Sequence, residues 1–137
     1  MSISLTFALM DAPYESSRTV TALRLIDIAA RRGYDLKIFA YEGAVALAYK
    51  DQAAHANIVH KHDIEEENHP LPHKWIESLH ETAVQHKGSI EWVNCDICGD
   101  ERGIDNYVEC TRGGTHVDFW QFVSSTDNTL VIGTTTT

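Results

Sequence analysis

The sequence is poor in basic residues, in long apolar runs and in paired cysteines. It has 11 Lys and Arg against 20 Asp and Glu, for a formal net charge of -9, which argues against nucleic-acid binding because that needs a basic face. No run approaches the ~20 consecutive apolar residues of a membrane span. The N-terminal residues also lack the pattern of a secretory signal. We therefore expect a cytoplasmic protein, with no membrane or direct nucleic-acid partner.

The cysteine content does not suit a disulfide framework. The 3 cysteines are an odd number, and Cys95, Cys98 and Cys110 all lie in the last third of the chain. A secreted domain stabilised by disulfides uses pairs spread around the fold. In a reducing compartment such thiols are reactive, metal-binding or simply buried.

The length of the chain limits the number of domains that it can form. A chain of 137 residues with 43% hydrophobic content can bury one sizeable core but not two. We expect a single domain over residues 1–133. The threonine run at 134–137 is expected to be a disordered tail.

Apolar spacing alternates between strand-like and helix-like along the chain. Strands joined by full helices favour right-handed parallel crossovers. The sequence therefore predicts a single-domain, three-layer α/β fold with a mostly parallel sheet and helices on both faces. The expected strands are 3–9, 35–41, 90–94 and 129–132, and the expected helices are 18–32, 42–50, 74–86 and a segment around 117–123.

Residues 52–72 have the least regular pattern. They combine an acidic run with two prolines, and they are expected to form a solvated loop or lid between elements rather than a linker between domains. Adventitious metal binding is the less favoured reading. The histidines in this segment are His55, His60, His62 and His69.

Cys95 directly follows a predicted strand. Reactive groups in open parallel sheets collect beyond the carboxyl ends of the strands. If a helix begins after Cys95, its N-terminus favours thiolate over thiol, and a thiolate is the nucleophile that accepts sulfane sulfur. Arg102 can add positive charge as a thiolate stabiliser, although Asp96, Asp100 and Glu101 oppose it.

Two parts of the chain carry recognisable motifs. In the first, Asn94-Cys95 is followed by Arg102-Gly103-Ile104, so that a cysteine stands seven residues before an Arg-Gly-hydrophobic end. The second part runs from the first strand to the turn after the second strand. Its segments are Phe7-Ala8-Leu9, Asp11-Ala12-Pro13-Tyr14, Gly33-Tyr34-Asp35-Leu36 and Phe39-Ala40-Tyr41-Glu42-Gly43-Ala44. Together these two parts resemble the DsrE/DsrF-like family, and its TusD-type members in particular.

This resemblance implies a flavodoxin-like fold and a sulfur carrier or sulfurtransferase. It implies a persulfide on Cys95, donor and acceptor protein partners, and assembly into homotrimers, hexamers or hetero-oligomers with related subunits. We place Tyr14, Glu42 and Asn94 in the substrate crevice, and no cofactor or metal is expected. Phe119 and Trp120 can serve the subunit interface or the core.

Cys98 leaves alternatives open, because Cys95-Asp96-Ile97-Cys98 is a C-x-x-C. Cys98 is either a resolving thiol or inert. A thiol-disulfide oxidoreductase using both cysteines is the main alternative, although no cis-proline loop is evident. A zinc site completed by His116 or the loop histidines is weaker, because no second ligand pair follows closely. A non-catalytic binding module at the crevice is also possible. Cys110 is expected to pack or to lie on a loop.

Overall fold

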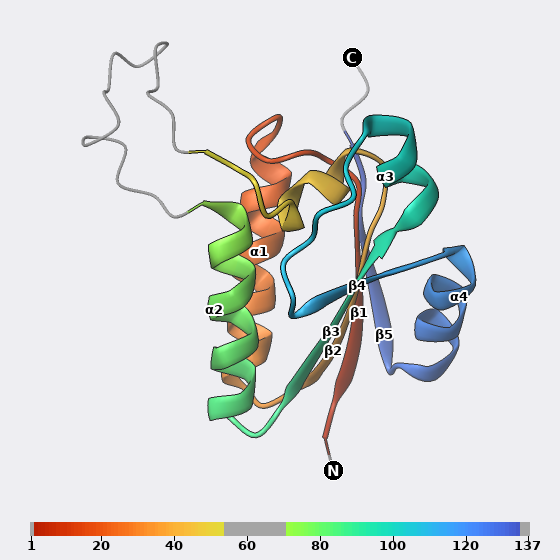
Figure 1. The fold of residues 1–137 in the computed structure, drawn as a ribbon. Coiled ribbons are helices and arrows are strands. Elements are labelled where there is room, and N and C mark those ends of the chain that lie inside the picture. The colour runs from red at the N-terminus through yellow and green to blue at the C-terminus, as the bar shows by residue number, and fades with distance from the viewer. Residues whose placement is uncertain (1, 54–70, 135–137) are drawn as a thin grey trace.

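One parallel sheet organises the protein in the computed structural model, which describes residues 2–53 and 71–134 (Figure 1). The five strands of the described part lie in the order β4-β3-β2-β1-β5, and every neighbouring pair is parallel. The elements are β1 (Ser4–Leu9), α1 (Ser17–Arg31), β2 (Asp35–Ala40), the 3-10 helix η1 (Glu42–Ala48), α2 (Pro72–Gln85), β3 (Ser89–Cys95), α3 (Asp96–Arg102), β4 (Thr111–Gly114), α4 (His116–Ser125) and β5 (Asn128–Ile132).

Helices cover both faces of this sheet. Figure 1 shows α1 and α2 side by side on one face and α4 on the other, with α3 beyond the carboxyl end of β3. The predicted single-domain α/β fold with a parallel sheet and helices on both faces is confirmed. The domain limit at residue 133 stays a prediction.

Helix α1 shows how local sequence sets an element and its packing. Ser16 begins it, because the Ser16 hydroxyl accepts a hydrogen bond from the Arg18 backbone N–H. Its apolar stripe buries Leu23 and Ile26 against the sheet. The chain then turns at Gly33, where φ is 73°. A side chain there would also approach the His86 carbonyl oxygen to 2.6 Å, so the turn requires glycine.

The two faces of the sheet carry separate apolar cores, because successive side chains of a strand point to opposite faces. On the face covered by α1 and α2, Ile38 and Trp92 are fully buried. On the α4 face, Phe39 and Val93 form a second core that also contains Cys95, Cys98 and Phe122. The cysteine pair therefore belongs to the smaller core, under α3 and α4.

The predicted strands and helices appear within about two residues of their expected limits, with two corrections. Residues 42–50 were expected to form a short helix, and the structure has the 3-10 helix η1 over Glu42–Ala48. Strand β4 was not predicted. Its sequence, Thr-Arg-Gly-Gly, has no apolar alternation, and it is held at the sheet edge by pairing with β3.

Several predictions fall on residues that the structure does not describe. Most of the histidine-rich segment 52–72 and the tail residues 135–137 lie outside the described ranges. Over the described ranges, none of the helices is long and apolar enough to cross a membrane.

Candidate thiol site at the end of β3

The chain leaves β2 and β3 toward opposite faces of the sheet. After β2 it enters η1 and then α2, which pack on the α1 face. After β3 it enters α3, whose Cys98 packs in the core of the α4 face. In open α/β sheets, ligands bind beyond the carboxyl ends of the strands. Cys95 ends β3 and Glu42 follows β2, so both stand at this position.

Cys95 and Cys98 are joined by a hydrogen bond at the start of α3. The Cys98 backbone N–H donates to Cys95 Sγ across 3.3 Å, so Cys95 acts as the N-cap of the helix. The two side chains are only 1% and 3% exposed. The expected helix after Cys95 is confirmed. Both thiols are thus almost completely covered.

The surroundings of Cys98 keep it protonated at neutral pH. Burial raises the pKa of the Cys98 thiol to about 11, and the hydrogen bond with Cys95 and the charges of Cys95 and Glu42 act in the same direction. A backbone hydrogen bond from Glu42 opposes the shift. Cys98 is therefore a neutral thiol beside Cys95, able to donate its S–H but slow to act as a nucleophile.

Arg102 ties α3 to η1 beside the two cysteines. One terminal guanidinium nitrogen donates to the Cys98 carbonyl oxygen at 3.2 Å, and the other donates to Glu42 Oε2 at 3.1 Å. Glu42 holds a left-handed backbone conformation, with φ of 50°, which is costly for a residue with a side chain. The Arg102 guanidinium thus forms an ion pair with Glu42. The role of Arg102 as a thiolate stabiliser stays a prediction.

The other two residues predicted for the crevice lie in different surroundings. Tyr14 stands in the loop after β1, with φ of 63° and its side chain exposed. Asn94 is buried within β3, where Oδ1 accepts from Trp92 Nε1 at 3.1 Å and Nδ2 donates to Thr111 Oγ1 at 3.0 Å. Asn94 therefore faces away from Cys95, joining β3 to β4. Contact of either residue with a substrate stays a prediction.

An aromatic stack borders the site, and the sequence did not reveal it. The Phe39 ring stacks with Tyr41 and with Phe119, at centroid distances of 5.5 Å and 5.2 Å, and the His116 ring meets Phe39 edge-on at 5.3 Å. These aromatic rings pack with the core that holds the cysteines. Alternation in β2 indicates that Phe39 and Tyr41 share a face, but it cannot show that α4 lies over them.

Tyr107 is a second neighbour of the cysteines that sequence reasoning missed. Its hydroxyl donates to the Ile104 carbonyl oxygen at 3.2 Å and lies against Gly99 of α3. Burial raises the pKa of Tyr107 to about 12, and the negative charges of Asp96 and Asp100 add to the shift. No periodic pattern surrounds Tyr107 in the sequence, so only the folded loop brings it to α3.

The structure gives limited information on metal binding. Over residues 2–53 and 71–134, no three His, Cys, Asp or Glu side chains are grouped closely enough to hold a metal ion. His116 is engaged with the Phe39 ring. The loop histidines proposed as further zinc ligands lie outside the described residues.

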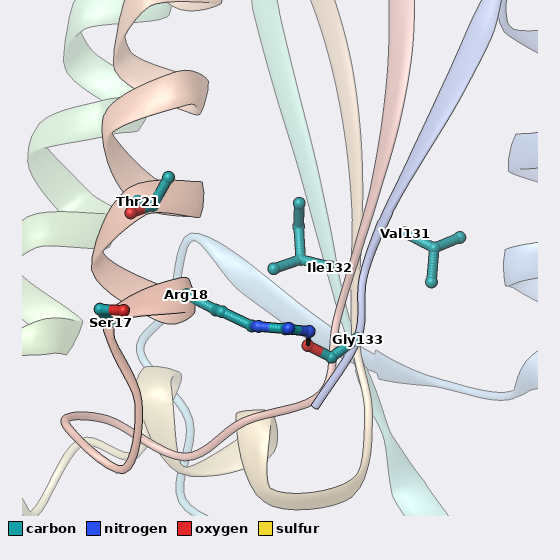
Figure 2. Close-up of a pocket in the computed structure, with 6 residues that line it drawn as sticks. All are labelled: Ser17, Arg18, Thr21, Val131, Ile132 and Gly133. Carbon is teal, nitrogen blue, oxygen red and sulfur yellow. Dashed lines mark hydrogen bonds between the residues drawn. The ribbon is translucent and has the colours of Figure 1, made fainter. Parts of the chain in front are cut away.

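A separate hollow of about 290 Å³ lies at the carboxyl end of β5 (Figure 2). Arg18 of α1 reaches across it and donates to the Gly133 carbonyl oxygen at 2.7 Å. Ile132 points toward α1 in this view, whereas Val131 points to the other face. The hollow contains neither cysteine, and its arginine is occupied by the chain itself.

Cys110 differs from the other two cysteines in its surroundings. It is exposed just before β4, beside Glu77 and His80 of α2. Partial burial and the charge of Glu77 raise the pKa of its thiol. Cys110 provides an internal control for experiments on the cysteine pair.

The fold and site together define a flavodoxin-like α/β protein with a buried thiol pair at the carboxyl end of a parallel strand. The sequence matches the DsrE/DsrF-like family over residues 4–130, and the chain belongs to this family. Its members are in general sulfur-relay proteins. The fold is also similar to the crystal structure of the YchN protein from E. coli, with a TM-score of 0.72, 21% sequence identity, and coverage of 96% of this chain and 99% of that chain. The comparison with curated protein sequences found no match.

Proposed function

We propose that this protein is a sulfur carrier, or sulfurtransferase, that holds sulfane sulfur as a persulfide on Cys95 and passes it to a partner protein thiol. The observation that carries the proposal is the hydrogen bond from the Cys98 N–H to Cys95 Sγ at the carboxyl end of β3. This contact fixes the Cys95 sulfur at the strand end, where reactive groups of open α/β sheets collect. Cys98 stays protonated, so the nucleophile is assigned to Cys95.

The transfer consists of two exchanges. Cys95 thiolate attacks the terminal sulfur of a donor persulfide, a new S–S bond forms, and the donor leaves as a thiolate. An acceptor thiolate then attacks the terminal sulfur on Cys95, and Cys95 leaves as a thiolate. No net oxidation occurs in either step, so the protein needs only an activated thiolate, access and positioning.

Cys95 is 1% exposed, so a partner must open its cover, and we assign this opening to the contact between α3 and η1. The side chains that join these two elements, Arg102 and Glu42, are themselves partly exposed. A donor or acceptor that binds there can replace the ion pair and uncover the sulfur. Tyr14, at the same edge of the sheet, is part of the proposed docking region.

The proposal includes assembly with partner subunits and a cytoplasmic location. Phe119 packs inward on Phe39, whereas Trp120 is 72% exposed on α4. Val117 and Val123 of the same helix are also exposed. An exposed apolar surface of this kind supports a homo-oligomer, a trimer or hexamer, or a hetero-oligomer with related subunits.

Intact-protein mass spectrometry after incubation with polysulfide tests the carrier function. Cys110→Ser, which lacks the exposed thiol, is expected to gain one sulfur atom that dithiothreitol removes, whereas the double variant Cys95→Ser/Cys110→Ser does not gain it. Equal sulfur uptake by these two variants would contradict the proposal.

A thiol-disulfide oxidoreductase is the alternative function, and the contact between Cys95 and Cys98 favours it. This function predicts a reversible disulfide with a defined reduction potential. In the same spectra, it would appear as a loss of two hydrogen atoms that is never preceded by a gain of sulfur and that substitution of either cysteine abolishes.

A further inference from the structure

We propose that Cys98 discharges the Cys95 persulfide when no partner thiol does so, releasing hydrosulfide and leaving a Cys95–Cys98 disulfide. This inference rests on the proposed carrier function and gives the protein a second reaction at the same site. The chain would then be a carrier in the presence of its acceptor and a slow source of sulfide in its absence.

The geometry of the pair supports this reaction. Cys95 ends β3 and Cys98 lies in the first turn of α3, so the two side chains leave the backbone on the same side. The Cys98 N–H contacts Cys95 Sγ at 3.3 Å, and the two thiols also share a side-chain hydrogen bond. A sulfur held on Cys95 therefore has Cys98 as its nearest thiol.

The apolar surroundings also favour Cys98 over outside thiols. Both cysteines pack with Val45, Val93 and Phe122 in the core of the α4 face. A solvent thiol must displace part of this cover to reach Cys95, whereas Cys98 is already inside it. The intramolecular exchange thus avoids the cost of bringing two molecules together.

The proposed reaction is balanced without an external oxidant. Cys98 Sγ attacks Cys95 Sγ, the bond between Cys95 Sγ and the terminal sulfur breaks, and the terminal sulfur leaves with the bonding electron pair as hydrosulfide. The Cys98 proton is lost to water or to the leaving sulfur. The sulfane sulfur is reduced by two electrons, and the two cysteines are oxidised to the disulfide. A dithiol reductant must then reduce this disulfide before the next cycle.

The protonation of Cys98 keeps the discharge slow at neutral pH. Its pKa of about 11 leaves only a small thiolate fraction there, so the rate is expected to rise with pH. This delay gives an acceptor protein time to take the sulfur first. The ionisable side chains that interact with Cys98 are Cys95 of β3, Tyr41 and Glu42 after β2, Arg102 of α3 and Tyr107 after α3.

A loading and chase experiment tests the inference. Protein is loaded with polysulfide, freed of excess reagent by gel filtration, and followed by intact mass and a hydrosulfide electrode. In wild type, the persulfide mass is expected to give way to a species that lacks two hydrogens, with one hydrosulfide released per chain. The rate is expected to be independent of protein concentration and to rise between about pH 7 and 9.

Variants separate this reaction from the carrier function. Cys98→Ser and Cys98→Ala are expected to keep the Cys95 persulfide at least about tenfold longer, because the internal thiol is gone. Two substitutions are used because Cys98 is buried, and thermal melts identify a variant that unfolds. Cys110→Ser is the matched control and is expected to discharge as wild type does.

The possible failures are distinguishable. Persulfide lifetimes that are equal in wild type and in the folded Cys98 variants would overturn this inference and leave the carrier function standing. Failure of Cys95 to take up sulfur in any form of the protein would overturn both. A discharge rate that falls on dilution would also overturn the inference, because it would place the attacking thiol on another molecule.

Discussion

Arg102 donates a hydrogen bond to Glu42 Oε2 across 3.1 Å and thereby joins the helix after β3 to the helix after β2. The same guanidinium holds the Cys98 carbonyl oxygen at 3.2 Å. The ion pair is partly exposed, so it contributes modestly to stability, about 0.2–1 kcal/mol. Its position is more important than its strength, because it joins two elements directly beside the two buried thiols.

Loss of this ion pair is expected to expose Cys95. In Glu42→Ala, α3 and η1 separate more often, and the rate of Cys95 alkylation by iodoacetamide is expected to rise about two- to fivefold, as an interaction of this size implies. Peptide mapping by mass spectrometry measures the rate at each cysteine. High salt is expected to raise the wild-type rate in the same direction.

Glu101→Ala is the matched control for this prediction. Glu101 also approaches Arg102, at 3.7 Å, but both residues belong to α3, so their contact joins no other element. Its removal is expected to leave the Cys95 alkylation rate close to wild type. If both variants accelerate alkylation equally, the Glu42 contact does not control access.

Asn94 is expected to stabilise the sheet rather than to act in sulfur transfer. Asn94→Ala leaves the buried Trp92 Nε1–H without a partner and frees the Thr111 hydroxyl. An unsatisfied buried donor costs about 1–3 kcal/mol of unfolding free energy. Urea unfolding measures this loss, with exposed Asn106→Ala as the control. An Asn94→Ala protein of full stability that no longer accepts sulfur would support the predicted place of Asn94 in the crevice.

Most of the fold could be predicted because its elements carry apolar periodicity. The continuous apolar run that ends at Leu9 predicts a buried strand, whereas the apolar residues of α1 recur at helical spacing. Strand and helix were therefore distinguishable. Strand β4 has no such signal. Its Gly113 and Gly114 pair with Asn94 and Cys95 only because β3 is already in the sheet, which is a tertiary effect that local sequence does not encode.

The candidate site was predictable in position but not in detail. The strand end and the Cys-to-Arg spacing indicated Cys95, Cys98 and Arg102. Arg102 and Glu42 are 60 positions apart in the chain, so their hydrogen bond depends on how α3 packs against η1. Neither this contact nor the burial of both thiols follows from spacing alone.

His80 is expected to make stability depend on pH. Burial lowers the pKa of His80, and its Nε2 is buried without a hydrogen-bond partner among residues 2–53 and 71–134. As the pH falls, His80 therefore binds a proton in the unfolded chain before it does so in the folded protein. The free energy of unfolding is thus expected to fall as the pH drops below about 6.5. His80→Leu is expected to be stabilised relative to wild type more at pH values near 5 than near 8, as measured by urea unfolding.

Exposed His86 supplies the control for His80. Its Nδ1 makes the same contact with a carbonyl oxygen one turn back, at 2.9 Å, but the residue lies on the surface. The assignment to His80 fails if His86→Leu changes the pH dependence by the same amount.

Gly99 is expected to be essential for the close packing of α3 over the cysteines. A side chain at this position would meet the Tyr107 hydroxyl and approach the Ile104 carbonyl oxygen to 2.6 Å. Gly99→Ala is therefore expected to lower the unfolding free energy by about 1–3 kcal/mol, since the helix must shift away from the loop. The same shift should raise the alkylation rate of Cys95. Gly133→Ala, where a side chain meets no atom within 4 Å, is the control and should change neither quantity. A Gly99→Ala protein that matches this control would show that α3 can move without uncovering the sulfur site.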